Sequence, residues 1–167
     1  HLDKAKKGFA ESMPALKSRT VSLRIRGSKA DKERVALNTA NTPKGQIRAG
    51  ETLFKMFCIG CHGPEGKGLP SIAPTLHSDW VSGDREILVK VLLKGLGGQI
   101  KVNGELQNYE AAMPGFGPAL GDDEIASILS YVRSAWTDAP ADVTSAFVRK
   151  IRGAEKGKTG PYELSLI

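Results

Sequence analysis

The sequence predicts an all-α domain that carries a small β-hairpin and follows an N-terminal extension. Two segments, 84–94 and 122–136, have apolar residues at helical spacing, and a third helix is predicted over 50–58. An Asn-Gly pair between two short apolar segments predicts the hairpin. Residues 38–45 are rich in Asn, Thr, Pro and Gly, which is typical of a linker between the extension and these elements.

Residues 1–49 are expected to form this extension. Residues 1–17 are compatible with a short basic helix. Val21, Leu23 and Ile25 alternate with polar residues, which favours a half-buried strand. We expect the extension to pack on the core or on another chain, or to be a remnant of a larger polypeptide.

The helix predicted over 50–58 has Leu53, Phe54 and Phe57 at helical spacing. The loop that follows is rich in glycine and proline, so its backbone can run close to a flat group. In the helix over 84–94, acidic residues lie in the first turn and Gly95 provides the stop. The hairpin is centred on Asn103-Gly104.

The helix over 122–136 has the clearest apolar face, and we expect Asp122 to cap it. After Pro140 a short helix is expected over 143–152, followed by a Gly- and Lys-rich tail. We therefore divide the chain into a basic extension or linker (1–49), a central domain (50–138) and a C-terminal strap (139–167).

Composition and charge narrow the class of protein. Of 167 residues, 40% are hydrophobic and 25% charged, which is ordinary for a soluble globular protein, and no segment is long and apolar enough to span a bilayer. Basic residues outnumber acidic ones by 12 to 4 in 1–49, and by 5 to 3 in 139–167, but the ratio is 7 to 11 in 50–138. Because the positive charge is so uneven and no nucleic-acid-binding motif is present, we expect no nucleic-acid partner.

The motif Cys58-Ile59-Gly60-Cys61-His62 indicates the chemistry of the chain. It has the spacing of a c-type haem attachment site. Two thiols at this spacing can each form a thioether with a vinyl group on one porphyrin edge, and the adjacent His62 can then bind the iron. We therefore expect one covalently bound haem c.

The cysteine pair has three other interpretations. A thioredoxin-like redox couple needs a βαβ setting, which residues 45–75 do not show. A zinc site would need Cys58, Cys61, His62 and His77 together, and the adjacent Cys61 and His62 would have to bind one ion. A disulfide across two residues would close a small strained ring. Covalent haem is favoured over all three.

Beyond this motif the chain resembles the class I cytochrome c family over about residues 50–137. The features that carry the resemblance are Gly50-x-x-x-Phe54 before the attachment motif, Ala73-Pro74-x-Leu76, Met113-Pro114 and a final helix with Tyr131. Segments 78–81, 94–98 and 128–136, together with Tyr109, look like the cytochrome subunits or domains that accompany periplasmic dehydrogenases.

The resemblance implies a class I cytochrome c fold, with helices around one covalently bound haem. The first and last helices would cross at Gly50, where the missing side chain allows a close approach and Phe54 packs beside Tyr131. The Pro74 carbonyl would accept a hydrogen bond from the His62 ring and orient it.

The second axial ligand has four candidates: Met13, Met56, His77 and Met113. Met113 is favoured because it lies in a Gly/Pro loop before the last helix, where the family's distal methionine sits. Met56 lies too close to Cys58 to cross the ring, Met13 belongs to the extension, and His77 is a weaker alternative. Trp80 and Tyr109 are expected either to line the haem pocket and reach a propionate, or to be ordinary packing aromatics.

Imidazole and thioether ligands together suit a carrier of single electrons, because both iron positions are filled and the soft sulfur favours the reduced iron. The expected function is a relay between a periplasmic dehydrogenase and another cytochrome or an oxidase, outside the cytoplasmic membrane. The alternatives are a peroxidase-like haem enzyme or a gas sensor with a displaceable distal ligand, and a basic interaction module without haem.

The basic segment 1–49 generates a prediction about docking. If its positive charge steers an acidic redox partner, the rate of electron transfer should fall steeply as ionic strength rises. Stopped-flow measurements across a salt series would check this. A rate that does not depend on salt would remove the docking role from this segment.

Overall fold

The structure is a computed structural model, and it describes residues 42–163, which belong to one unit of the chain. The helix and strand predicted within residues 1–41 and the candidate ligand Met13 therefore lie outside the described residues. The elements are α4 (Pro43–Phe57), α5 (Ile59–His62), α6 (Asp79–Ser82), α7 (Arg85–Lys94), β1 (Gly95–Gly97), β2 (Ile100–Val102), β3 (Glu105–Gln107), β4 (Met113–Pro114), α8 (Asp122–Trp136), α9 (Ser145–Ala154) and β5 (Tyr162–Glu163).

Helix α4 begins seven residues before the predicted helix start at Gly50. The side chain of Thr42 accepts a hydrogen bond from the Gly45 N–H at 3.1 Å, and Pro43 occupies the first turn, where its missing N–H costs nothing. Thr-Pro is thus a helix start, and the end of the predicted linker over 38–45 is helical. The predicted boundary between residues 49 and 50 falls inside α4.

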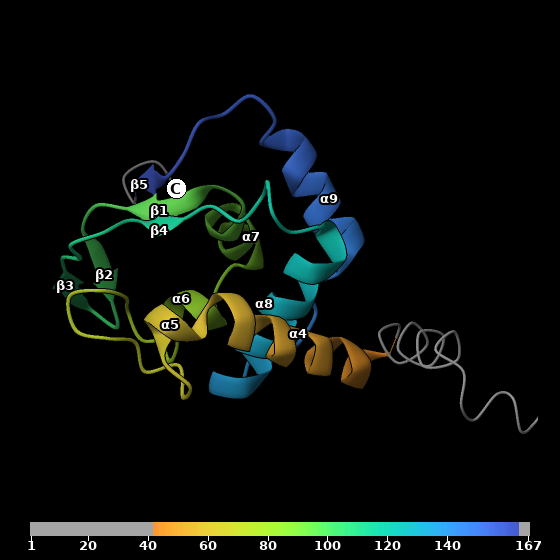
Figure 1. The fold of residues 1–167 in the computed structure, drawn as a ribbon, viewed down its shortest axis with the longest axis horizontal. Helices are drawn as coiled ribbons and strands as arrows, with labels where there is room; N and C mark the ends of the chain where they lie inside the picture. Colours follow the sequence, from red (N-terminus) through yellow and green to blue (C-terminus); the bar gives the residue numbers. More distant parts are fainter. Residues whose placement is uncertain (1–41, 164–167) are drawn as a thin grey trace, which may run out of the picture. The chain divides into compact units, whose positions relative to one another are not determined.

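Helices α4 and α8 cross at Gly50. A Cβ atom at this position would lie 1.9 Å from the Ser127 carbonyl oxygen and 2.7 Å from the Tyr131 Cβ, so only glycine fits without moving a helix. Phe54, with 1% of its surface exposed, packs its ring 5.7 Å from that of Tyr131 and 4.9 Å from that of Trp136. The predicted crossing is confirmed, and Figure 1 shows α4 running across α8.

Helix α8 has the predicted bounds, but its cap differs from the prediction. The N-cap is Gly121, whose N–H donates to the Glu124 carboxylate at 2.8 Å. Asp122 is the first helical residue, and its carboxylate instead accepts hydrogen bonds from Arg149 at 3.2 Å and Arg152 at 2.7 Å, both on α9. The expectation that Asp122 caps the helix is therefore wrong, because α9 supplies stronger partners.

The predicted helix over 84–94 and the predicted hairpin are both present. Asp84 caps α7 by accepting from the Glu86 N–H at 2.7 Å, and Gly95 ends the helix with a φ of 91°. Strands β2 and β3 pair antiparallel around Asn103 and Gly104, whose φ angles are 50° and 89°. These left-handed angles are those that the Asn-Gly turn requires.

A second sheet was not predicted, so the all-α description is incomplete. Its order is β4-β1-β5, with β1 antiparallel to β4 and parallel to β5. Each strand has only two or three residues, and the three come from distant parts of the chain. No alternating pattern can develop in so few residues. Figure 1 shows these strands on one side of the domain and α8 and α9 on the other.

The C-terminal segment contributes to the core. The expected helix over 143–152 is present as α9, two residues further along, and its Val148 and Ile151 are buried in the same apolar cluster as Phe54 and Ile128. The predicted strap therefore packs as part of the domain up to the end of α9. None of the helices in residues 42–163 is both long and apolar enough to cross a membrane.

The crossing at Gly50 generates a stability prediction. Gly50→Ala should lower the free energy of unfolding by more than about 2 kcal/mol, because the added methyl group overpacks the contact with Ser127. Chemical denaturation followed by circular dichroism would measure the loss. Gly153→Ala in α9 is the matched control, since a Cβ there meets no atom within 4 Å. Equal stability of the two variants would contradict the close crossing.

The contact between Asp122 and α9 generates a pH prediction. Burial acts to raise the pKa of Asp122, but the hydrogen bonds and charges of Arg152 and Arg149 outweigh it and hold the pKa below its ordinary value. A lowered pKa stabilises the fold above the unfolded-state value of about 3.9, and this stabilisation is lost as the pH falls further. Asp122→Asn should therefore cost about 1 kcal/mol at pH 7 and less near pH 3. Urea unfolding of the wild type and the variant at both pH values measures this loss of unfolding free energy. A loss that does not depend on pH would contradict the role of the Asp122 charge.

Candidate functional site

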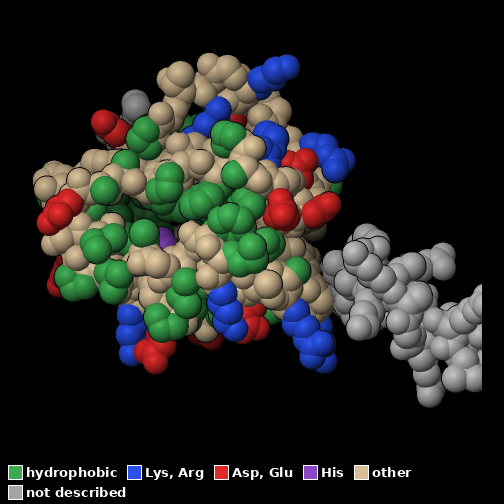
Figure 2. Space-filling view, in the orientation of Figure 1, with side chains coloured by type: hydrophobic (Ala, Val, Ile, Leu, Met, Phe, Trp, Pro, Cys, Tyr) green, Lys and Arg blue, Asp and Glu red, His purple; other side chains and the backbone are tan. Residues whose placement is uncertain are grey.

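A cavity with an almost wholly apolar wall lies between α4, α7, α8 and the two sheets. The space between its side chains measures about 810 Å³, and part of it is open to solvent. Figure 2 shows apolar side chains around this hollow, with a histidine visible inside it. The lining residues are Phe54, Cys58, His62, Pro74, Thr75, Leu76, Ser78, Trp80, Val81, Ile87, Leu88, Val91, Leu92, Leu96, Ile100, Val102, Met113, Ile128, Leu129 and Val132.

The cysteine pair lies where α4 ends and α5 begins. Cys58 ends α4, its N–H donating to the Phe54 carbonyl at 2.8 Å, and its buried side chain lines the cavity. Cys61 lies on α5 and is exposed. Burial, with a smaller effect of Cys61, raises the pKa of the Cys58 thiol to about 11, so the free thiol is protonated at neutral pH. One thiol thus faces the cavity and the other lies one helical turn further, toward solvent.

His62 is the last residue of α5, is 8% exposed and lines the cavity. Its Nδ1 lies 3.1 Å from the Pro74 carbonyl oxygen, the contact that the family resemblance implied. Since the carbonyl can only accept, Nδ1 carries the proton and Nε2 keeps a free lone pair. Burial lowers the pKa of His62, and the bond to Pro74 offsets this only in part. The imidazole is therefore neutral at pH 7, as a metal ligand must be.

The loop between His62 and Trp80 is folded tightly enough to fix Pro74. The Gly68 N–H donates to the His62 carbonyl at 2.9 Å, and the Leu76 N–H donates to the Gly66 carbonyl at 2.7 Å. Gly68 has a φ of 75°, and a Cβ there would lie 2.3 Å from the Ala73 carbonyl oxygen. The glycine-rich sequence thus allows the loop to close on itself and places the Pro74 carbonyl beside His62.

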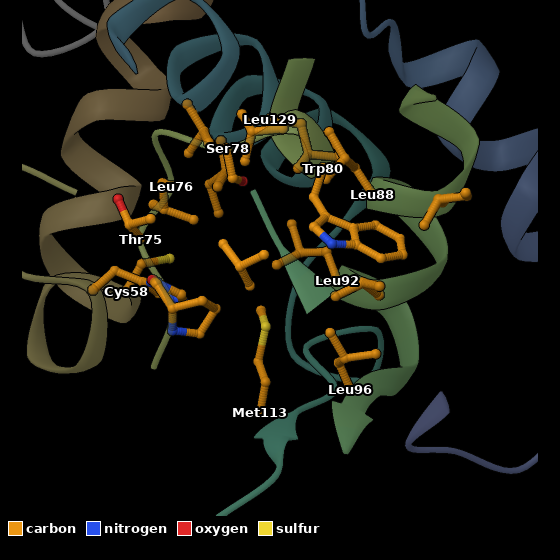
Figure 3. Close-up of a pocket in the computed structure, with 18 of the residues that line it drawn as sticks. Cys58, Thr75, Leu76, Ser78, Trp80, Leu88, Leu92, Leu96, Met113 and Leu129 are labelled. Atoms are coloured by element: carbon orange, nitrogen blue, oxygen red, sulfur yellow. The ribbon is translucent and has the colours of Figure 1, made fainter. Parts of the chain in front are cut away.

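The candidate distal ligands differ in whether they line the cavity. Met113 lies on β4, half-buried, and Figure 3 shows its side chain extending into the cavity toward the other labelled residues. Met56 is 66% exposed and does not line the cavity. His77 does not line it either, and its Nε2 contacts the Glu65 carbonyl at 2.8 Å. Of the candidates within residues 42–163, Met113 alone shares the cavity with His62.

The two predicted aromatic residues have different positions. Trp80 lines the cavity, and its Nε1 donates to the Lys101 carbonyl at 2.6 Å, which ties α6 to the hairpin strand β2. Tyr109 is not among the lining residues; its hydroxyl bonds to Gln107, and its ring borders a shallow depression that also includes Pro74. The structure thus brings Trp80, but not Tyr109, together with Met113.

Sequence reasoning missed most of the cavity wall and the residue that holds one side of it. Arg133 is 4% exposed and donates to the carbonyls of Val81 at 2.8 Å and Gly83 at 2.9 Å, which anchors α6 to α8. The available signal was an arginine inside the apolar face of α8. The apolar wall from α7, β1 and β2 has no comparable signal, because Leu, Ile and Val fill any core.

The residues present fit a covalently attached haem. The wall is almost wholly apolar, the Cys58 thiol lies at its edge with Cys61 one helical turn further, and a neutral imidazole and a thioether reach the same space from separate parts of the chain. Nitrogen and sulfur are the donor atoms that hold haem iron in electron-transfer proteins. Within residues 42–163, no group of three or more His, Cys, Asp or Glu side chains is placed to hold a metal ion.

Comparison with known proteins agrees with this geometry. The family model "Cytochrome c" matches residues 47–136. Cytochrome c-552 of Thermus thermophilus is 41% identical over 87 residues, which are 49% of this chain and 64% of that protein. The fructose dehydrogenase cytochrome subunit of Gluconobacter japonicus is 31% identical over 70% of this chain and 24% of its own length.

A third relative is the cytochrome c subunit of the quinone alcohol dehydrogenase of Gluconobacter oxydans, 30% identical over 65% of this chain and 23% of its own length. The chain therefore spans less than two thirds of these relatives, and about a quarter of the dehydrogenase subunits. The family model covers more than half of the chain, including every residue that lines the cavity. The chain belongs to the cytochrome c family, a family of electron-transfer proteins that carry haem c.

Proposed function

We propose that this protein is a c-type cytochrome with one haem that relays single electrons. The observation that supports this best is the convergence of His62 and Met113 on one apolar cavity whose edge carries Cys58. Each of these residues comes from a different element: α5, β4 and the end of α4.

Each residue of the site has a part in this proposal. Cys58 and Cys61 would attach the haem through thioethers, and His62 and Met113 would bind its iron. Pro74 holds the His62 ring through the bond to Nδ1 and so directs Nε2 into the cavity. The bound haem supplies a centre that changes its charge by one electron. Trp80, Leu92 and the other wall residues exclude water, so the site reorganises little when that charge changes.

The partners are proposed from the relatives. Several relatives are cytochrome subunits of fructose, alcohol and gluconate dehydrogenases, so we propose a dehydrogenase as electron donor. Another relative is subunit FixP of a cbb3-type cytochrome c oxidase, which supports a second cytochrome or an oxidase as acceptor. Because haem c is attached outside the cytoplasmic membrane in bacteria, we propose a periplasmic or other extracytoplasmic location.

The proposal predicts the spectrum of the whole protein. The denatured chain should keep the mass of one haem, because thioethers survive unfolding. The ferric protein should show a long-wavelength sulfur-to-iron charge-transfer band, and the ferrous protein should not bind carbon monoxide. Mass spectrometry and absorption spectroscopy measure all three. An open iron that binds carbon monoxide readily would instead support a peroxidase-like enzyme or a gas sensor, and a mass without haem would contradict every haem-based function.

A substitution tests the distal ligand directly. Met113→Ala should abolish the long-wavelength band, allow carbon monoxide to bind and lower the reduction potential, because the soft thioether favours the reduced iron. Met56→Ala is the matched control, since Met56 is exposed and does not line the cavity. If Met113→Ala keeps the wild-type spectrum, another residue is the ligand.

A further inference from the structure

The segment that carries Met113 is held on one side by α7 and β1. We call residues 113–120 the Met113 loop. Leu96 of β1 is the register partner of Met113, and the N–H groups of Phe116 and Gly117 donate to the carbonyls of Leu92 at 2.8 Å and Leu93 at 3.1 Å. These bonds use carbonyl groups at the end of α7 that have no partner within the helix.

The other side of the Met113 loop is held by a side chain of α9. Arg152 donates through Nη1 to the Gly117 carbonyl at 2.6 Å and through Nη2 to the Leu120 carbonyl at 2.8 Å. Its Nε donates to the Asp122 carboxylate at 2.7 Å, at the start of α8. The planar guanidinium of Arg152 thus links two points of the Met113 loop to Asp122 at the start of α8. The ion pair with Asp122 fixes the direction of the guanidinium.

The end of the chain closes the same region. Glu155, only 2% exposed, accepts hydrogen bonds from the Lys158 ammonium at 3.0 Å and from the Tyr162 hydroxyl. The Lys94 ammonium donates to the Lys158 carbonyl at 2.7 Å, and Tyr162 of β5 is the register partner of Leu96. Strand β1 therefore has Met113 of β4 on one edge and the C-terminal segment on the other, which fixes it from both sides.

We propose that Arg152 is a positioning residue for the distal ligand. By fixing the Gly117 and Leu120 carbonyls, it limits the excursions of the Met113 loop that would withdraw the Met113 sulfur from the iron. Loss of Arg152 increases the fraction of molecules in which Met113 is detached. This inference rests on the proposed function, in which Met113 is the ligand, and adds a residue remote from the cavity that controls how firmly the ligand is held.

The test is competition by imidazole in the full-length ferric protein. Imidazole occupies the distal position only while Met113 is detached, so its apparent affinity rises in proportion to the detached fraction. Arg152→Ala removes two charge-assisted hydrogen bonds to the loop and should raise the apparent imidazole affinity by about tenfold. The loss of the long-wavelength band during the titration is the readout.

Two control variants separate positioning from general stability. Arg149 lies on the same helix and pairs with the same Asp122 but has no bond to the Met113 loop, so Arg149→Ala should leave the imidazole affinity unchanged within about twofold. Val148 is buried in the core and does not line the cavity. Val148→Ala should lower the unfolding midpoint without changing the imidazole affinity.

The conservative variant Arg152→Lys covers the case in which Arg152→Ala does not fold. Lysine keeps the positive charge beside Asp122, but it cannot bond to two carbonyls at once as the planar guanidinium does. The apparent imidazole affinity of Arg152→Lys should therefore also rise. Equal imidazole affinities in the wild type, Arg152→Lys and Arg149→Ala would overturn the proposal, provided that Met113→Ala abolishes the long-wavelength band. If the wild type lacks that band, the proposed ligand itself is wrong, and the two failures are thereby distinguished.

Discussion

The close approach of α4 and α8 at Gly50 is the contact on which the rest of the domain depends. With no side chain at this position, the backbone of α4 meets the Ser127 carbonyl directly, and Phe54 fills the space beside the crossing against Tyr131 and Trp136. The end of α4 is thereby fixed relative to α8. Since Cys58 ends α4 and His62 ends α5, the position of the whole attachment motif follows from this crossing.

The cavity combines two requirements that conflict in most protein interiors. For the proposed haem site it must be apolar, so that water is excluded, and it must still present donor atoms to a metal. The proposed donors are an imidazole that burial keeps neutral and a thioether that carries no charge, so neither adds a buried charge to the wall. The one polar group at His62 that needs a partner, its ring N–H, finds it in the Pro74 carbonyl.

Arginine side chains add polar contacts to the apolar packing of the segments around the cavity. Arg133 fastens the end of α6 to α8, and Arg152 fastens the Met113 loop to α9 and to the start of α8. In both cases several carbonyl groups of short helices and loops bind one guanidinium, which offers five donors in a fixed plane. A domain with short helices and two- or three-residue strands can thus keep its loops in one arrangement.

The sequence alone determined the local features of this protein: the bounds of α8, the end of α7 at Gly95, the Asn103-Gly104 hairpin and the attachment motif. Each depends on residues that are neighbours along the chain, so spacing and turn chemistry are sufficient to predict it. The glycine at the crossing and the Pro74 contact with His62 came from the family resemblance. The start of α4 was also a local feature, Thr42 followed by Pro43, that the linker interpretation of 38–45 missed. Only the tertiary structure decided the sheet β4-β1-β5, the positions of Tyr109 and His77, and the partners of Asp122, Arg133 and Arg152. These features join residues that are distant in the sequence, and no local pattern records which carbonyl or carboxylate an arginine will meet after folding.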